Sequence, residues 1–195
     1  MKSLDQQFWD ERYASGRTGW DIGYASTPLT TYIDQLNDLN LNILIPGAGN
    51  GYEVIYLLEK GFKNLTVIDI SAAAIKNIGK KLPEGYSVNL IRDDYFNHQG
   101  SYDIIIEQTF FCALLPELRK KYVSHSHSLL KDRGSIVGLL FNMIFNREGP
   151  PFGGSQEEYR LLFQDFFSIR YCDPCYNSIA QRAGSEVFIK FIKKT

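Results

Sequence analysis

Two kinds of residue in this sequence are suited to holding a small molecule: glycines at a strand-to-helix turn and an acid after the next strand. In the stretch NILIPGAGNGYEV, Gly47, Gly49 and Gly51 follow a short apolar run. Glycine adopts positive φ and lets a ligand approach the backbone, although many such turns use glycine only to turn the chain. Asp69 ends the next apolar run about 20 residues later, the spacing typical of an acid that binds both hydroxyls of an adenosine ribose. We therefore predict a ribose-bearing ligand; a helix N-terminal acid is the structural alternative for Asp69.

The residues after the first two glycines discriminate between ligands. A dinucleotide site has the pattern Gly-x-Gly-x-x-Gly, and Tyr52 stands where its third glycine would be. A phosphate-binding P-loop ends in Gly-Lys-Ser/Thr, and GNGYEV has neither the lysine nor the hydroxyl. S-adenosylmethionine (SAM) contains no phosphate and needs close backbone and carboxyl partners instead. We therefore predict that Gly47, Gly49 and Asp69 bind SAM.

A further set of acids and aromatic residues follows the next apolar run, in LIRDDYF. An acid there can accept a hydrogen bond from the adenine amino group, and Tyr95 or Phe96 can lie near the ring. The carboxyl ends of parallel strands meet at one edge of a sheet, where open α/β sheets bind ligands. We expect Asp94 and Tyr95 on the adenine side, with Asp93 as the alternative acid.

Two tryptophans and two tyrosines lie within residues 9–24, before the first predicted strand: Trp9, Tyr13, Trp20 and Tyr24. The sulfonium of SAM is a cation, and an aromatic face stabilises a cation by about 0.5–2 kcal/mol when water is excluded. The alternative is that this segment simply covers a hydrophobic patch. We interpret it as a lid over the ligand.

Methyl transfer needs little acid–base chemistry. The protein must hold the nucleophile, carbon and sulfur in line, with reacting atoms about 3–3.5 Å apart, and must exclude water. His125 and His127 are two apart on a predicted helix and do not share a face. One C-x-x-C pair, Cys172 and Cys175, is weak support for zinc, and we interpret Cys112 as a small buried hydrophobe. We predict no metal and assign no catalytic residue.

The side that receives the methyl group is predicted to be hydrophobic, because apolar side chains desolvate an anion or a thiol. The aromatic residues nearest the expected acceptor are Phe111, Phe141 and Phe152, with Phe110 and Met143 beside them.

Positioning these residues requires an alternation of strands and helices. Apolar runs rich in β-branched residues predict strands at 42–45, 65–70, 87–91, 102–106 and 135–141, and helical spacing occurs at 53–60 and 72–81. The stretch LLPELRKKYVSHSHSLLKDRG predicts a helix that ends at Lys131, Arg133 and Gly134.

The carboxy-terminal part differs in character. A loop, GPPFGGS, precedes a predicted helix at 156–163, and two strands follow in FFSIRYC and SEVFIKFIKK. The last strand alternates, which suits an antiparallel hairpin added at the edge of the parallel sheet. The predicted fold class is α/β: a Rossmann-like, mostly parallel sheet with an antiparallel last strand and helices on both faces.

Length and composition limit the possible partners. We expect one domain over residues 1–195, with residues 1–40 as the amino-terminal lid. The net charge of -1 offers no electrostatic footprint for nucleic acid or an anionic membrane. No run approaches about 18 apolar residues, and the first residues do not resemble a signal peptide. Three cysteines suggest a reducing compartment, so we predict a cytoplasmic protein, as a monomer or a weak homodimer.

Over nearly its whole length the sequence resembles the thiopurine S-methyltransferase superfamily, and within it the plant "harmless to ozone layer" halide and thiol methyltransferases. The matching stretches are FWDERYASGRTGWDIGYASTPL, LIPGAGNGYEV, VIDIS, FFCALLPELRKKY and EGPPFGGSQEEYRLLF. The resemblance implies a single Rossmann-like domain that binds SAM under a lid. By position, it implies SAM contacts at Trp9, Tyr13, Trp20, Gly47, Asp69, Asp94, Tyr95 and Gln108. Tyr13 stands where the plant proteins tend to have tryptophan, and Gln108 and Phe141 where they tend to have tyrosine.

We therefore expect a SAM-dependent methyltransferase that acts on a small soft nucleophile: a thiol, a thiopurine, hydrosulfide, thiocyanate or a halide. Phenylalanine at position 141 argues against halide specificity, since a tyrosine hydroxyl could orient the acceptor. Two alternatives remain open, which are O- or N-methylation of a small metabolite and a SAM-binding module without turnover.

Overall fold

The computed structural model describes residues 4–86, 88–146 and 148–195. The chain divides into two compact units, Met1–His98 and Gln99–Thr195. That residues 1–195 form a single domain with residues 1–40 as its lid stays a prediction.

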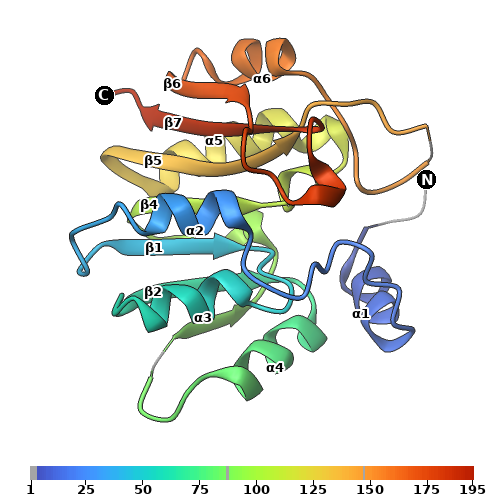
Figure 1. Cartoon of the computed structure of the whole chain (residues 1–195), viewed down its shortest axis with the longest axis vertical. Coiled ribbons are helices and arrows are strands. Elements are labelled where there is room, and N and C mark those ends of the chain that lie inside the picture. Colours follow the sequence, from blue (N-terminus) through green and yellow to red (C-terminus); the bar gives the residue numbers. More distant parts are fainter. Residues whose placement is uncertain (1–3, 87, 147) are drawn as a thin grey trace. The chain divides into compact units, whose positions relative to one another are not determined.

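The amino-terminal unit alternates helices and strands (Figure 1). Its elements are α1 (Gln6–Ala14), α2 (Thr27–Ile33), β1 (Asn42–Pro46), α3 (Tyr52–Glu59), β2 (Asn64–Asp69), α4 (Ala72–Lys81), β3 (Asn89–Arg92) and the 3₁₀ turn η1 (Tyr95–Asn97). The strand order is β3-β2-β1, and both pairings are parallel. The strands predicted at 42–45 and 65–70 are confirmed to within one residue. The third strand begins at Asn89, and its predicted start, Ser87, lies outside the described residues.

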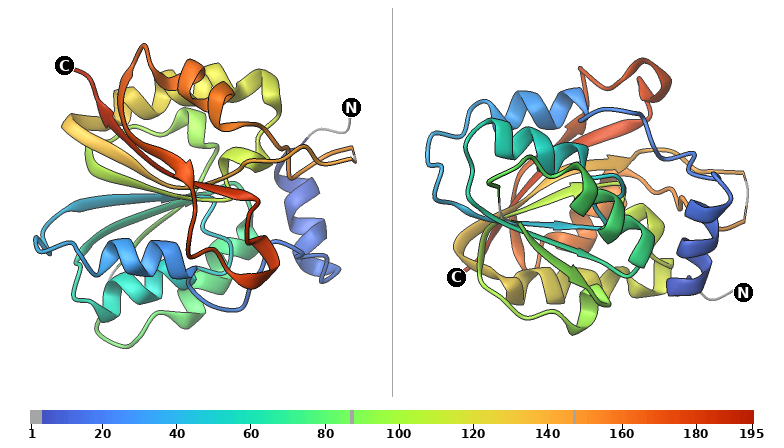
Figure 2. Two further views of the ribbon diagram at one scale, coloured as in Figure 1. Left: turned by 45° about the horizontal axis from the view of Figure 1, so that its top comes forward. Right: turned by 90° about the horizontal axis from the view of Figure 1, so that it is seen from below.

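Burial in this unit follows the apolar pattern. Ile43 and Leu44 of β1, Val67 of β2 and Val54 and Leu57 of α3 are fully buried. Helices α2 and α3 lie on the same side of these strands (Figures 1 and 2). Because β1 and β2 are buried along most of their length, the residues that follow their carboxyl ends are the ones free to serve a site.

The carboxy-terminal unit begins with a parallel pair and ends with antiparallel strands. Its elements are β4 (Tyr102–Gln108), the 3₁₀ turns η2 (Phe111–Ala113) and η3 (Pro116–Leu118), α5 (Arg119–Leu129), β5 (Leu130–Phe141), α6 (Gln156–Phe163), β6 (Phe167–Pro174), the 3₁₀ turn η4 (Ala180–Arg182) and β7 (Glu186–Lys193). Strands β4 and β5 are parallel, whereas β7 pairs antiparallel with β5 and β6, in the order β4-β5-β7-β6. The α/β class, the helix at 156–163 and the antiparallel last strand are confirmed. The predicted edge hairpin is formed by β6 and β7, with β6 as its outer strand.

The helix predicted to end at Gly134 is wrong over its last turn. Helix α5 stops at Leu129, and β5 begins at Leu130, which pairs with Tyr102 of β4. Arg133 has φ of 62°, and the β4–β5 register shifts between Tyr102 and Ile104. The basic residues and glycine that indicate a helix terminus therefore form an irregular strand start, because pairing with β4 overrides the local signal.

Aromatic side chains fill the interior of the carboxy-terminal unit. The rings of Phe111, Tyr122, Tyr159 and Phe163 contact one another, and Phe163 also packs on Phe191 of β7. Helices α5 and α6 lie together on one side of the strands (Figure 2). In the described part of the chain, no helix combines the length and hydropathy needed to cross a bilayer.

Candidate functional site

The glycine turn after β1 has the backbone conformation that its sequence predicts. Gly47, Gly49 and Gly51 all adopt positive φ, at 57°, 57° and 72°. The amide of Gly47 donates to Ile68 O of β2 over 2.8 Å, which holds the turn against the neighbouring strand. A Cβ on Gly51 would lie 2.8 Å from Ile78 Cγ1 of α4. Gly51 therefore serves the packing of α4 against the start of α3, which leaves Gly47 and Gly49 as the predicted ligand-side glycines.

Asp69 lies beside this turn and accepts hydrogen bonds from backbone amides. Its Oδ1 accepts from Ser71 N over 2.8 Å, and its carboxylate also accepts from Gly49 N. Burial raises the pKa of Asp69 to about 6, since the two amide donors offset only part of the desolvation and the charge of Asp10 adds to the rise. The structure thus brings Asp69 and Gly49 into contact, and ribose binding by Asp69 stays a prediction.

The aromatic residues of the amino-terminal segment form a cluster over the glycine turn. Trp20 makes edge-to-face contacts with Trp9 and with Tyr13, each with ring centroids 5.6 Å apart. The Cβ position of Gly49 is 3.7 Å from both Trp20 Nε1 and Tyr13 Oη. Burial and the charges of the nearby acids, Asp69 foremost, raise the pKa of Tyr13. The predicted lid aromatics are therefore gathered in a negative electrostatic environment, which favours a cationic ligand.

Two acids that the sequence interpretation missed hold this cluster in place by hydrogen bonds. Asp10 of α1 accepts a hydrogen bond from Ser71 Oγ at the start of α4, and Asp21 accepts one from Asn50 Nδ2 in the glycine turn. Asp21 belongs to the Trp-Asp-x-Gly stretch, and Asp10 follows Trp9 directly. The signal in the sequence was therefore an aspartate directly after each of the two tryptophans, Trp9 and Trp20.

The acids and aromatic residues that follow β3 differ in exposure and in the hydrogen bonds they make. Asp94 is exposed and caps η1 by accepting from Phe96 N over 2.9 Å. Asp93 is also exposed and bonds within its own turn, to Asp94 N and Asn97 Nδ2. Tyr95 is only 4% exposed, whereas Phe96 is half-buried. That Asp94 and Tyr95 contact adenine stays a prediction, and Phe96 is the more accessible of the two rings.

In the carboxy-terminal unit, the end of β4 is held by a buried carboxylate. Glu107 is completely buried and accepts from Phe111 N and Tyr122 Oη, each over 2.9 Å. Burial raises the pKa of Glu107 to about 7. Gln108, the predicted SAM-side residue of this unit, follows it and is half-buried, and Thr109 then turns the chain with φ of 64°.

Phe111 does not form part of an exposed acceptor surface. Its side chain is 0% exposed and packs edge-to-face against Tyr122 and Tyr159. The reason is that η2 turns Phe111 inward, since its amide bonds to the buried Glu107. Cys112 is buried as expected, and burial raises its pKa. We therefore base the acceptor side on Phe141 and Phe152.

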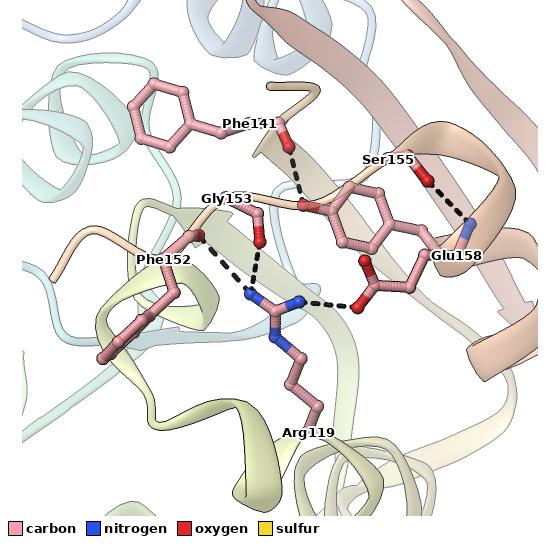
Figure 3. Close-up of polar contacts among 7 residues, drawn as sticks. Arg119, Phe141, Phe152, Gly153, Ser155 and Glu158 are labelled. Carbon is pink, nitrogen blue, oxygen red and sulfur yellow. Dashed lines mark hydrogen bonds and ion pairs between the residues drawn. The ribbon is translucent and has the colours of Figure 1, made fainter. Parts of the chain in front are cut away.

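Phe141 and Phe152 are both half-buried, and the backbone carbonyl of each accepts a hydrogen bond from a side chain (Figure 3). Phe141 O accepts from Tyr159 Oη over 2.6 Å, and Phe152 O accepts from Arg119 Nη2 over 3.4 Å. The guanidinium of Arg182, a residue the sequence interpretation missed, lies 5.6 Å from the centre of the Phe141 ring. Arg182 also pairs with the buried Glu186 at 3.4 Å.

The residues of the amino-terminal unit fit SAM. A carboxylate accepts about four hydrogen bonds, so Asp69 retains capacity for ribose hydroxyls beyond its two amide donors. Gly47 and Gly49 carry no side chain that would cover the backbone, and Trp20 and Tyr13 of the predicted lid lie beside Gly49. Within the described residues, no group of three His, Cys, Asp or Glu side chains is arranged to hold a metal ion.

The chain resembles solved structures of methyltransferases. The chain superposes on magnesium protoporphyrin IX methyltransferase from Synechocystis, solved with bound SAM, with a TM-score of 0.76 at 16% identity, covering 100% of this chain and 99% of that one. It also superposes on 1,6-didemethyltoxoflavin N1-methyltransferase from Burkholderia thailandensis, with a TM-score of 0.75 at 17% identity, covering 97% and 87%. These likenesses show the fold of class I SAM-dependent methyltransferases. The protein is an enzyme of this class, with SAM as its cofactor.

The family follows from sequence. The family model described as thiopurine S-methyltransferase matches residues 4–187, so the chain belongs to the thiopurine S-methyltransferase family. It is 31% identical over 160 residues to the probable thiol methyltransferase 2 of Arabidopsis thaliana, covering 79% of this chain and 70% of that protein. It is 26% identical over 193 residues to thiocyanate methyltransferase 1 of Brassica oleracea, covering 95% and 84%. The thiopurine S-methyltransferase of Acinetobacter baylyi is 25% identical over 211 residues, covering 93% and 94%. The resemblance inferred from the motifs is confirmed.

Proposed function

We propose that this enzyme transfers the methyl group of SAM to a small soft nucleophile: a thiol, a thiopurine, hydrosulfide, thiocyanate or a halide. Relatives named as thiol, thiocyanate and thiopurine methyltransferases support this substrate class. The observation in the chain itself that carries it is the pair of half-buried rings, Phe141 and Phe152, with the Arg182 guanidinium beside the first.

On the cofactor side, the carboxylate of Asp69 accepts hydrogen bonds from the ribose hydroxyls of SAM. The backbone at Gly47 and Gly49 leaves room for the methionine end of SAM. Trp9, Tyr13 and Trp20 cover the sulfonium, and their aromatic faces and the nearby acids stabilise its positive charge. Asp94, Tyr95 and Gln108 complete the proposed set of SAM contacts. When bound, SAM supplies a methyl group on a cationic sulfur, a centre open to in-line attack.

On the acceptor side, aromatic surface removes water from the nucleophile, which raises its reactivity toward carbon. A cation beside that surface favours an anion over a neutral molecule. The positive charge of Arg182 is partly balanced by Glu186, so Arg182 attracts an anion moderately and lets it exchange. This combination suits thiolates, thiocyanate and halides.

The acceptor needs no strong general base from the protein. Hydrosulfide, thiocyanate and halides are already anions, and aromatic thiols and thiopurines ionise near neutral pH. Cys112, whose carbonyl accepts a hydrogen bond from Phe152 N, is not a competing nucleophile because burial raises its pKa and suppresses the thiolate.

The test is a panel of acceptors with purified enzyme and SAM. Thiopurine, thiophenol, hydrosulfide, thiocyanate, iodide and small phenols are supplied separately, and S-adenosylhomocysteine is quantified. We expect turnover with the sulfur nucleophiles. Turnover only with phenols would indicate O-methylation instead, and silence across the panel with SAM binding intact by calorimetry would indicate a binding module without turnover.

Asp69→Ala serves as the cofactor control in the same panel. We expect it to lose SAM binding, because the carboxylate supplies the ribose contact. Full-strength SAM binding by this variant would overturn the ribose assignment while leaving the acceptor result to stand on its own.

A further inference from the structure

Arg119, the first residue of α5, is a buried arginine whose guanidinium reaches into the loop before α6 (Figure 3). It is 5% exposed. Its Nη2 donates to Gly153 O over 2.8 Å and to Phe152 O over 3.4 Å, while its Nη1 donates to Glu158 Oε1 over 2.7 Å. One side chain therefore holds two consecutive carbonyls of the loop and a carboxylate of the helix that follows.

The same loop is held from other directions by backbone hydrogen bonds. Phe152 N donates to Cys112 O over 2.6 Å, and Gly154 N donates to Met143 O over 3.0 Å. A Cβ on Gly153 would lie 1.8 Å from Met143 O, so the two backbone segments approach as closely as glycine allows. Residues 152–154 therefore have one position, defined by η2, by the chain after β5 and by Arg119.

Tyr159 of α6 links this loop to the end of β5. A Cβ on Gly154 would lie 2.4 Å from Tyr159 Oη, so the loop backbone packs directly on that phenol. The phenol donates to Phe141 O over 2.6 Å (Figure 3). The backbones of Phe141 and Phe152, the two proposed acceptor-side residues, are thus held by two neighbouring sets of hydrogen bonds, one from Tyr159 and one from Arg119, which meet where Gly154 packs on the phenol.

The contacts of Arg119 do not explain, by stability alone, why an arginine is buried at this position. Its partner Glu158 has a side chain that is 47% exposed, and Arg119 Nε is buried with no hydrogen-bond partner among the described residues. The guanidinium also stacks 4.9 Å from the centre of the Phe111 ring, an apolar setting that a hydrophobic side chain would fill well. Replacing a buried ion pair by apolar side chains of similar size is often neutral or stabilising, and the exposed Glu158 would not be left as a buried, unpaired charge without Arg119. A hydrophobic side chain could not donate hydrogen bonds to the carbonyls of Phe152 and Gly153, as the planar fork of N–H donors in the guanidinium does.

We propose that Arg119 is a positioning residue of the acceptor side, which fixes the Phe152 loop by binding the carbonyls of Phe152 and Gly153. This inference rests on the proposed function, because it assigns Phe152 to the acceptor. Loss of the fork frees the loop and misplaces Phe152 without changing the amino-terminal unit's contacts with SAM.

The experiment compares Arg119→Met, Arg119→Lys and wild type by hydrogen exchange and by steady-state kinetics. In Arg119→Met, we expect exchange at the amides of Phe152 and Gly154 to rise about tenfold or more, with a similar loss in kcat/KM for the acceptor. KM for SAM stays within about twofold. Arg119→Lys supplies a charge but no planar fork, so it rescues the pairing with Glu158 and restores the acceptor kinetics only in part.

Arg160→Met is the matched control. Arg160 of α6 also binds a carbonyl, Cys172 O at 3.0 Å, and a carboxylate, Asp173 at 3.1 Å, but it holds β6 and not the loop. We expect Arg160→Met to leave the exchange of the loop and the acceptor kinetics unchanged. Equal effects of the two methionine variants would reduce Arg119 to a general structural role and overturn the proposal.

Glu158→Gln keeps the experiment decisive if Arg119→Met does not fold. It retains the fork on the two carbonyls, so we expect slow loop exchange and wild-type acceptor kinetics, with Arg119→Lys impaired in both. Wild-type exchange and kinetics in Arg119→Lys would overturn the proposal. If the wild-type enzyme methylates nothing in the panel, the proposed function fails, and the exchange comparison still decides whether Arg119 anchors the loop.

Discussion

Asp10 Oδ1 accepts a hydrogen bond of 2.6 Å from Ser71 Oγ, although the two residues are 61 positions apart. Asp10 Oδ1 also accepts from Ala73 N over 3.2 Å, so the carboxylate of α1 lies at the amino-terminal end of α4. Burial alone would raise the pKa of Asp10, but these hydrogen bonds outweigh it and lower the pKa. Asp10 is therefore ionised at neutral pH and fastens the helix that carries Trp9 and Tyr13.

Asp10→Ala is expected to weaken SAM binding, because it frees α1 and with it the lid aromatics. Hydrogen bonds to a charged group contribute about 1.5–3 kcal/mol, so we expect Kd for SAM to rise about tenfold, as measured by calorimetry. Glu11→Ala, an exposed acid on the same helix, is the control and should bind SAM as wild type does. Equal affinity of Asp10→Ala and wild type would show that the contact does not hold the lid.

The affinity for SAM is expected to fall in mild acid. The pKa of Asp69 is raised to about 6, and the ionised carboxylate is the better acceptor for hydroxyl groups. Protonation below this value removes acceptor capacity, so we expect Kd for SAM to be about tenfold higher at pH 5 than at pH 7. In Asp69→Asn the binding should be weak and nearly independent of pH over this range. A pH profile shared by the variant and wild type would assign the titration to another group.

Glu107 is expected to make the protein less stable as the pH rises. Its pKa is raised to about 7 from an ordinary value of 4.5, so between these values the unfolded chain releases a proton that the folded protein keeps. The free energy of unfolding therefore falls through this window, by about 3 kcal/mol if no relaxation intervenes.

Glu107→Gln tests this dependence, since the amide can accept from Phe111 N and donate to Tyr122 Oη in place of the carboxyl group. Chemical denaturation of both proteins at pH 4.5 to 8 should show the variant gaining stability relative to wild type as the pH rises. A constant difference between the two proteins would contradict the buried titration.

Gly51→Ala is expected to destabilise the fold strongly. The residue has φ of 72°, and an added Cβ would lie 2.8 Å from Ile78 Cγ1, so backbone strain and a steric clash combine. We expect the free energy of unfolding to fall by about 2–4 kcal/mol in denaturant titrations. Gly16→Ala is the control, because its φ is 66° but nothing lies within 4 Å of its Cβ, which leaves only the strain. Equal losses in the two variants would argue against close packing by Ile78.

Phe152→Ala is expected to impair use of the acceptor and to leave SAM binding intact. Truncation removes aromatic surface from the acceptor side, whereas the backbone contacts of Phe152 with Arg119 and Cys112 remain. We expect kcat/KM for a thiol acceptor to fall about tenfold, with Kd for SAM within about twofold of wild type. Tyr176→Ala, an aromatic residue that is 90% exposed, is the control and should change neither quantity. A matched loss of SAM affinity in Phe152→Ala would remove Phe152 from the acceptor side.

Much of the fold could be predicted because its signals are local. Apolar β-branched runs and helical spacing correctly located β1, β2, α4 and α6, and the alternation of the last strand correctly indicated antiparallel pairing. The segment after α5 was misassigned because its basic residues and Gly134 satisfy the rule for a helix terminus. Leu130 instead pairs with Tyr102 of β4, a strand distant in sequence.

The candidate site divides in the same way. The glycines, Asp69 and the lid tryptophans were recognisable from residue type and spacing, and the structure brings Trp20 and Tyr13 beside Gly49. Phe111 was assigned to the acceptor surface from its place after β4, but its direction depends on the hydrogen bond of its amide to Glu107. Arg119 resembles any arginine at the start of a helix until its partners at 152, 153 and 158 are seen.

The sequence by itself determined the order and type of most elements, the glycine turn after β1 and the family, because these depend on periodicity, backbone preference and motifs within short segments. Only the tertiary structure decided which of Phe111 and Phe152 faces inward, which acids hold the lid and which arginine holds the loop. Those outcomes depend on burial and on hydrogen bonds between residues far apart in sequence, and no local pattern encodes them.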